Sequence, residues 1–290
     1  MSAPGAKSVL VTGANSGIGL LTCLEMAGAG WDVIGSARTT QKADRLTEAA
    51  AERELELRTV LLDVDDPASC ARAVAEVEEL TGGLHALVNN AGFAQSGAVE
   101  DVSDELARAQ LETNLVAPMR LARLVLPGMR ERGNGRIVNV SSVAGRMSTP
   151  LMGWYCASKH ALEAVTDALR MEVEGDGVKV TLVEPGMFAT DVWTAASDSG
   201  FPTPSTPRYA AAYARGTALG GRTDKLPDPV WVARTVRLAL TNPVPLARYV
   251  VGADAVGGIL TETLLPTVLT DYVKALTAGL RSPLRLPFLR

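Results

Sequence analysis

Short, continuous apolar runs alternate with helix-forming segments along most of the chain, and this alternation limits the folds that it can adopt. Runs such as 8–12 and 178–183 are typical of strands buried on both faces of a parallel sheet. The predicted strands cover residues 8–12, 32–37, 58–64, 84–88, 136–140, 178–183 and 248–251, and the predicted helices 17–29, 41–54, 67–80, 103–131 and 154–173. Six or seven such units predict an α/β fold with one doubly wound parallel sheet and helices on both faces.

No linker divides the 290 residues, so we expect a single domain over 1–290. Two regions depart from the alternation. Residues 191–229 contain five prolines with many Ser and Thr, which predicts a long irregular loop near the strand ends, where lids commonly lie. Residues 259–290 predict one or two amphipathic helices interrupted at Pro266. This tail has three open uses: core or lid packing, an oligomer contact, or a helix on a membrane surface. Its few charged residues favour packing.

Composition argues against several classes of function. A net charge of −4 and 4% aromatic residues disfavour nucleic-acid binding. The three cysteines are far apart and only two histidines are present, so we expect no disulfide framework and no metal site. This usage suits a reducing cytoplasm. The N-terminal residues lack a secretory pattern, and no apolar stretch is long enough to predict an integral membrane span.

A glycine-rich turn follows the first predicted strand and opens the first helix. Glycines at such a turn let the backbone approach a pyrophosphate, which then faces the helix N-terminus. The candidate binding residues are Gly13, Asn15, Ser16, Gly17, Ile18 and Gly19. The alternative is an ordinary glycine-rich turn without a ligand.

Three polar residues after later strands are candidate contacts to the adenosine half of a dinucleotide. The second strand ends in Ser36-Ala37-Arg38, without the carboxylate that would accept a ribose 2′-hydroxyl. Arg38 can pair a 2′-phosphate, so NADP(H) is favoured over NAD(H), the alternative being a solvated loop charge. Asp63 either bonds the adenine amino group or caps a turn. Asn90 either fixes a ribose or stabilises a turn.

Tyr155 and Lys159 are four residues apart on a predicted helix, which places them on one face. An ammonium beside a tyrosine favours the phenolate and lowers a pKa that is normally about 10. Ser142, just past the fifth strand, could steady a substrate oxygen, and Asn114 could bind a water that links Lys159 to solvent. Each residue alone has a structural alternative, whereas their conjunction favours catalysis.

Together, TGANSGIG, NNAG, VNVSS, YCASK and Glu184-Pro185-Gly186 make the chain resemble the short-chain dehydrogenase/reductase family. The resemblance implies a Rossmann-like sheet, a nicotinamide cofactor and Tyr155 as the proton donor in carbonyl reduction. It implies that Lys159 holds the nicotinamide ribose, that Ser142 binds the substrate oxygen and that Asn114 completes a proton relay. It adds these residues to the cofactor site: Val64, Ala91, Gly92, Tyr155, Lys159, Pro185, Gly186, Phe188 and Thr190.

The stretch after Tyr155 is similar to family members that act on steroids, retinoids and other lipophilic alcohols or ketones. This resemblance implies a small lipophilic substrate, and the family implies a dimer or tetramer built through the helices near 103–131 and 154–174. We therefore expect an NADP(H)-dependent oxidoreductase of the CH–OH group, in the cytoplasm. The rival hypothesis is a nucleotide-dependent binding or redox-sensor protein on the same fold.

Overall fold

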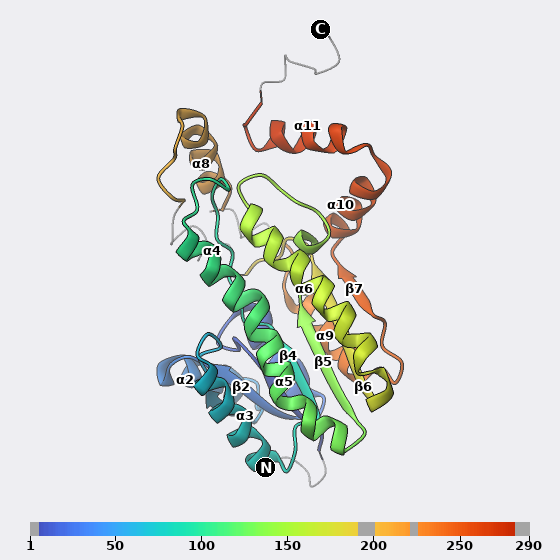
Figure 1. Cartoon of the computed structure of the whole chain (residues 1–290). Helices are drawn as coiled ribbons and strands as arrows, with labels where there is room; N and C mark the ends of the chain where they lie inside the picture. Colours follow the sequence, from blue (N-terminus) through green and yellow to red (C-terminus); the bar gives the residue numbers. More distant parts are fainter. Residues whose placement is uncertain (1–5, 191–200, 221–225, 282–290) are drawn as a thin grey trace.

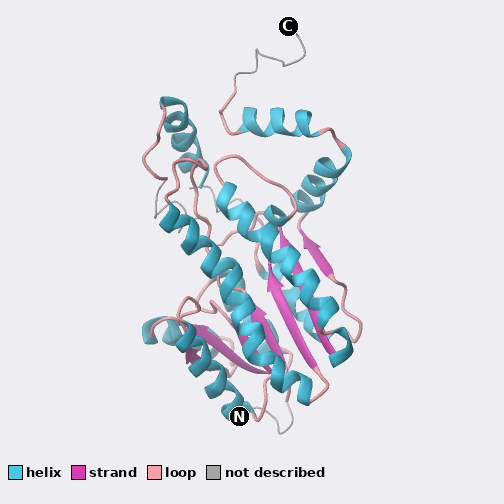
Figure 2. Cartoon of the chain, in the orientation of Figure 1, coloured by secondary structure: helices cyan, strands magenta, loops and turns pink. Residues whose placement is uncertain are grey.

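The computed structural model describes residues 6–190, 201–220 and 226–281. Its centre is one parallel sheet of seven strands in the order β3-β2-β1-β4-β5-β6-β7 (Figures 1 and 2). The strands are β1 (Ser8–Val11), β2 (Asp32–Ala37), β3 (Arg58–Leu61), β4 (Ala86–Asn89), β5 (Gly135–Val140), β6 (Val178–Pro185) and β7 (Arg248–Val251). The predicted Rossmann-like, single-domain fold is confirmed. Strand order reverses between β1 and β4, and ligands of such sheets bind beyond the carboxyl ends there.

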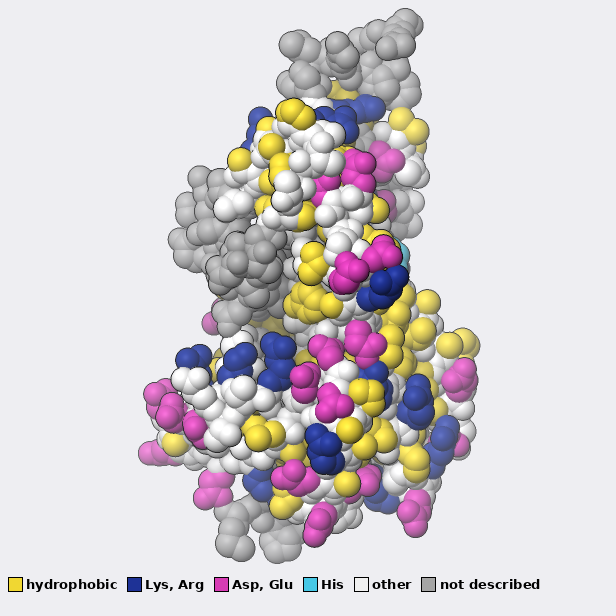
Figure 3. All heavy atoms as spheres, turned by 60° about the vertical axis from the view of Figure 1, so that its left-hand side comes forward, with side chains coloured by type: hydrophobic (Ala, Val, Ile, Leu, Met, Phe, Trp, Pro, Cys, Tyr) yellow, Lys and Arg dark blue, Asp and Glu magenta, His cyan; other side chains and the backbone are white. Residues whose placement is uncertain are grey.

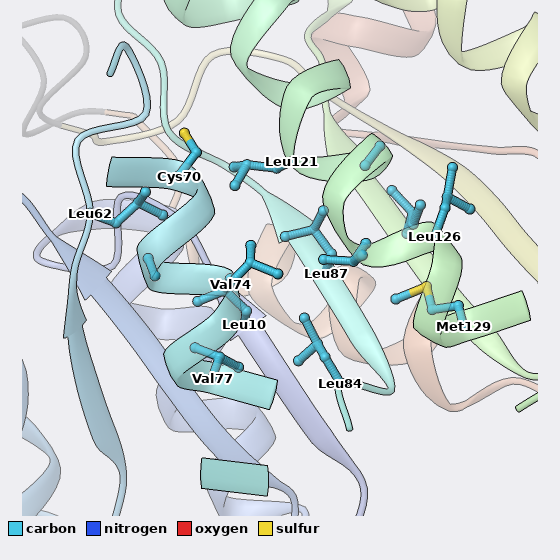
Figure 4. Close-up of a cluster of buried hydrophobic side chains, with 14 of the residues drawn as sticks. Leu10, Leu62, Cys70, Val74, Val77, Leu84, Leu87, Leu121, Leu126 and Met129 are labelled. Carbon is cyan, nitrogen blue, oxygen red and sulfur yellow. The ribbon is translucent and has the colours of Figure 1, made fainter. Parts of the chain in front are cut away.

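Helices cover both faces of the sheet. One face carries α3 (Pro67–Thr81), α4 (Asp104–Leu111), α5 (Ala117–Glu131) and α6 (Gly153–Glu172), and the other α1 (Gly17–Gly28), α2 (Thr40–Ala51) and α9 (Val230–Thr241). Figure 4 shows the first layer, in which Val74 and Val77 of α3 and Leu121 of α5 meet Leu10 and Leu87 of the sheet. Burying each such side chain contributes about 1.5–3 kcal/mol, so the layers hold the strand ends rigidly in register.

The predicted continuous helix over 103–131 is wrong in its middle. It begins as expected, with the Ser103 side chain capping α4, but residues Glu112–Val116 form a π-helix between α4 and α5. Pro118 has no N–H for the carbonyl of Asn114, so the α-helical ladder is broken there. The N–H of Ala117 instead reaches the carbonyl of Glu112 five residues back. This widened turn presents the Asn114 side chain to the carboxyl end of the sheet.

The sequence predicts an irregular loop over 191–229, but part of this region is helical. It contains helix α8 (Pro207–Gly220), which lies beyond the carboxyl ends of the strands (Figure 1). The Tyr213 hydroxyl of α8 donates to the Asp101 carboxylate and accepts the N–H of Ala98 at 2.7 Å. Phe201 stacks on the Tyr213 ring with centroids 4.4 Å apart. These contacts bind α8 to the 94–102 loop.

The tail forms two helices, α10 (Ala253–Leu264) and α11 (Thr267–Thr277), which meet at Pro266 as predicted. The predicted use was core or lid packing, and the structure does not show core packing, because only Ala255 and Thr270 of these two helices are buried. Lid packing stays a prediction. The exposed large apolar side chains of this tail face are Val256, Leu260, Leu264, Leu265, Val268, Leu269 and Val273. Among the described residues, no helix combines the length and apolar character needed to cross a bilayer.

The surface mixes both signs of charge. On the face drawn in Figure 3, acidic and basic side chains alternate over the lower body, with hydrophobic side chains between them. Neither sign forms a continuous field on this face.

Candidate active site

The glycine turn lies between β1 and α1, at the switch point of the sheet. Gly13 has φ +63°, and a Cβ there would lie 2.9 Å from the Cα of Ala91. A Cβ on Gly19 would lie 2.3 Å from the Gly13 carbonyl oxygen, so only glycine fits at either position. Gly19 therefore packs α1 against the turn. It is not among the residues that line the two cavities described below, and its direct contact with a cofactor stays a prediction.

Ser16 is the N-cap of α1, yet its side chain makes no capping hydrogen bond. In contrast, Thr39, Asp66 and Ser103 cap their helices by accepting a backbone N–H. The first N–H groups of α1 and the Ser16 hydroxyl are thus left for another acceptor beside the open turn. This arrangement fits the phosphate of a dinucleotide, because a helix N-terminus favours negative charge.

A cavity of about 550 Å³ extends from the glycine turn along the ends of β1, β2, β3 and β4. It is lined by twelve of the predicted cofactor residues: Gly13, Asn15, Ser16, Gly17, Ile18, Arg38, Asp63, Val64, Asn90, Ala91, Gly92 and Thr190. Its size falls in the usual range of small-molecule sites. The sequence reasoning missed Lys42, Phe93 and Thr113 on the same wall.

Two cations mark the end of this cavity near β2. Arg38 and Lys42 both line it, together with the buried Ser36. Within the described part of the chain, neither cation forms a salt bridge, whereas many other arginines do. Lys42 lies four residues after Arg38, in the first turn of α2, a spacing that could have drawn attention to it.

The alternatives for Asp63 and Asn90 are partly decided by their contacts. The Asn90 amide donates to the carbonyls of Thr12 and Gly13, at 2.9 and 3.2 Å, so it holds the end of β4 to the glycine turn. Asp63 Oδ1 accepts the N–H of Asp65 at 3.2 Å, which is a turn contact. Both residues also line the larger cavity, so these contacts leave room for a ligand.

A second, smaller cavity of about 70 Å³ adjoins the first and shares Ile18, Asn90, Gly92, Phe93 and Thr190 with it. Ser142, Tyr155 and Lys159 lie on its wall, as do Pro185 at the end of β6 and, after it, Gly186 and Phe188. Sequence reasoning missed Ser141 there. The fold therefore brings together the predicted catalytic triad, Ser142, Tyr155 and Lys159, and the predicted cofactor segment that follows Glu184.

Burial dominates the electrostatics of the triad. It raises the pKa of Tyr155 to about 12, although the nearby Ser142 side chain favours the phenolate and opposes this rise. This direction is opposite to the expected effect of Lys159, whose Nζ lies 5.9 Å from the centre of the tyrosine ring. Burial also lowers the pKa of Lys159 to about 8. Lys159 Nζ donates to the Val140 carbonyl at 2.9 Å, which holds the side chain beside β5.

Asn114 does not line either cavity. Its amide nitrogen donates to the carbonyl of Phe93 at 3.0 Å and to the hydroxyl of Ser158 at 3.1 Å, and its oxygen accepts the N–H of Phe93. Asn114 thus joins the π-helix to the loop after β4 and to α6, beside Lys159. These contacts assign the side chain a bracing position and use both of its donors.

The family follows from comparison with known proteins. The family described as short chain dehydrogenase matches residues 7–199, well over half of the chain. The chain belongs to the short-chain dehydrogenases. This membership makes it an oxidoreductase, as expected, and confirms the resemblance read from the glycine turn and the Tyr155–Lys159 pair.

Individual short-chain dehydrogenases are similar over nearly their whole length. The NADPH-dependent 3-dehydrocapnine reductase of Ornithobacterium rhinotracheale is 34% identical over 92% of this chain and 95% of its own. Retinol dehydrogenase 16 of Rattus norvegicus is 36% identical over 91% of this chain and 86% of its own. A solved short-chain dehydrogenase from Streptomyces avermitilis superimposes with a TM-score of 0.78, at 33% identity, over 97% of this chain and 99% of that one.

Proposed function

We propose that the chain is an NADP(H)-dependent oxidoreductase that interconverts a hydrophobic alcohol and its ketone or aldehyde, with Tyr155 as general acid and base. One observation carries this proposal: Ser142, Tyr155 and Lys159 line a pocket continuous with the glycine-walled cavity. The hydroxyls of Ser142 and Tyr155 and the buried Lys159 ammonium thereby lie next to a cavity that would hold a dinucleotide. A purely nucleotide-binding sensor would have no use for this pocket.

When bound, the nicotinamide would supply or accept the hydride. The chain's own residues manage the proton and the substrate oxygen. The raised pKa of Tyr155 keeps its hydroxyl protonated at neutral pH, ready to donate to a carbonyl oxygen. The Ser142 hydroxyl lies on the wall of the same pocket, where it would donate to that oxygen once substrate is bound and stabilise the negative charge that develops there. The Lys159 ammonium stabilises the phenolate left behind.

The preference for NADP(H) rests on the cationic end of the larger cavity. Arg38, Lys42 and Ser36 together offer two positive charges and a hydroxyl, which suits a ribose 2′-phosphate. The name of the 34% identical reductase points the same way, since that protein is described as NADPH-dependent. Asp63 and Asp65, in the loop after β3, line the same cavity.

A lipophilic substrate is supported by the apolar side chains around the catalytic pocket. Phe93 and Phe188 line it, and Ala94 and Met152 pack against Tyr155. The relative named retinol dehydrogenase is described as acting on a lipophilic alcohol. For the remaining partners, we propose a homo-oligomer built through α4, α5 and α6, and a cytoplasmic location that suits the buried free thiols of Cys23, Cys70 and Cys156.

The test is NADPH consumption, followed by absorbance, over a panel of lipophilic ketones and aldehydes. We expect turnover by the unaltered protein. Tyr155→Phe removes the hydroxyl that carries the transferable proton while keeping the ring, and should reduce kcat by about 10²–10⁴-fold with NADPH affinity retained. Full turnover by this variant would refute the role of Tyr155. Tight NADPH binding without turnover on any carbonyl would favour the sensor hypothesis.

A further inference from the structure

A cluster of buried charges lies behind the catalytic pocket, between α6, β6 and β7. Glu184, at the end of β6, is fully buried, and Glu163, one turn after Lys159 on α6, is 5% exposed. Arg248 of β7 lies between them, with its Nε 3.1 Å from Glu184 Oε1 and 3.1 Å from Glu163 Oε2. Neither catalysis nor cofactor binding, as described above, uses these side chains.

The hydrogen bonds in this cluster do not satisfy two carboxylates. The single Nε–H of Arg248 bonds Glu163, and both oxygens of Glu184 are left without a donor. Oε1 of Glu163 also has no partner. Burying a charged carboxylate without a hydrogen-bond donor costs free energy. One proton held between two carboxyl groups turns one of them into an O–H donor, and the other, still charged, accepts a charge-assisted hydrogen bond from it.

The charged groups that face the pair come from every neighbouring element. They are Arg146 of the loop after Ser142, Lys159 and Asp167 of α6 with its partner Arg170, Arg248 of β7 and, beyond Gly186, Asp254 of α10. Arg146 lies 3.5 Å from Glu184 Oε2 at the more exposed end, and Asp167 pairs with the far end of Arg248. Burial and the nearby Glu163 hold the pKa of Glu184 above its usual range, while Arg146 and Arg248 oppose this rise.

The pair also connects the parts of the active site. Glu163 is on the helix that carries Tyr155 and Lys159, and its charge favours the protonated form of Lys159. Glu184 directly precedes Pro185 and Gly186 on the pocket wall, and Arg146 follows Ser142 by four residues. A Cβ on Gly145 would lie 3.1 Å from Glu163 Oε1, so the turn after Ser142 packs directly on this carboxyl group.

We propose that Glu163 and Glu184 share one proton, and that the pair is a positioning unit that sets the pH at which Lys159 loses its own proton. The inference rests on the proposed reductase function for its kinetic consequence, but not for the shared proton itself. With the proton in place, the pair carries one negative charge. When it leaves, a second charge appears beside Lys159 and stabilises the ammonium further, so the active site stays competent to higher pH.

Two isosteric variants separate the roles of the pair. Glu184→Gln supplies an amide donor to Glu163 but cannot titrate, so we expect an inflection near neutral pH in the kcat/KM profile of the unaltered protein to disappear. Glu163→Gln removes the anion beside Lys159, so the alkaline limb should move to lower pH by about half a unit or more. Asp167→Asn is the matched control: it breaks the same arginine cluster two turns from Lys159 and should move neither feature. Coincident profiles for the unaltered protein and both glutamine variants would overturn the proposal.

A spectroscopic measurement keeps this test independent of turnover. In infrared titration of the protein without substrate, a protonated carboxyl band that is lost near neutral pH should be present in the unaltered chain and absent in Glu184→Gln. Such a band without any carbonyl reduction would uphold the shared proton and refute the reductase. Turnover with no such band would refute the shared proton while leaving the reductase intact.

Discussion

Arg38 and Lys42 lie on the wall of the larger cavity without a salt bridge among the described residues. If they bind a 2′-phosphate, Arg38→Asp should raise the Kd for NADPH by about 100-fold, because it replaces an attractive charge by a repulsive one. The Kd for NADH should change by no more than a few-fold. Fluorescence titration with both nucleotides measures the ratio, with Arg53→Asp, at an exposed position just after α2, as the control. An unchanged ratio would contradict the proposed preference.

Lys159 gives the reaction a pH dependence whose sign follows from its pKa. Burial lowers this pKa to about 8, so the ammonium is present below that value and is lost above it. Beyond the inflection near neutral pH that the Glu163–Glu184 pair predicts, carbonyl reduction should therefore decline as pH rises through about 8, because the neutral amine no longer stabilises the phenolate of Tyr155. The profile of kcat/KM between pH 6 and 10 tests this. Activity that rises through pH 8 would contradict it.

At the scale of elements, one buried hydroxyl attaches helix α8 to the 94–102 loop. Tyr213 joins this helix to Ala98 and Asp101, and it is 5% exposed. Tyr213→Phe keeps the stacking on Phe201 but leaves the N–H of Ala98 without its acceptor, which should cost about 1–3 kcal/mol locally. We expect faster amide hydrogen exchange in α8 and the 94–102 loop, with the sheet unchanged. Tyr209→Phe is the matched control, and equal exchange in both variants would refute this role of the hydroxyl.

The same elements mark how far the sequence could predict the fold and the site. Runs such as Ser8–Val11 and Ala86–Asn89 predicted their strands, because a strand buried on both faces is mostly apolar. The π-helix at Asn114 was missed because its cause is a single proline four residues later. Helix α8 was missed because prolines around it indicated a loop, although Pro207 is favourable at a helix start.

At the site, the sequence predicted which side chains lie together when they belong to one helix, because their spacing along it fixes the face on which they lie. Tyr155 and Lys159 share a helix face, and both line the predicted pocket. The direction of the Tyr155 pKa was not predictable, because burial arises from packing by several distant segments. The same holds for Glu163 and Glu184, which are 21 residues apart and meet only when α6 packs on β6.

For the whole molecule, the sheet and its two helical layers carry the stability, and the tail face contributes little to it. Leu264 and Val268 are 74% and 55% exposed, whereas Leu240 of α9 is 1% exposed. The double change Leu264→Gln and Val268→Gln should therefore alter the free energy of unfolding by less than about 1 kcal/mol, while Leu240→Ala should lower it by about 2–5 kcal/mol.

Denaturant unfolding monitored by circular dichroism compares these variants. Because the seven apolar side chains of the tail face remain exposed, the polar double variant should also be more soluble at high concentration. Light scattering at increasing concentration gives the second readout. If the double change destabilised the protein as much as Leu240→Ala does, the tail face would be covered in solution and would contribute to stability there.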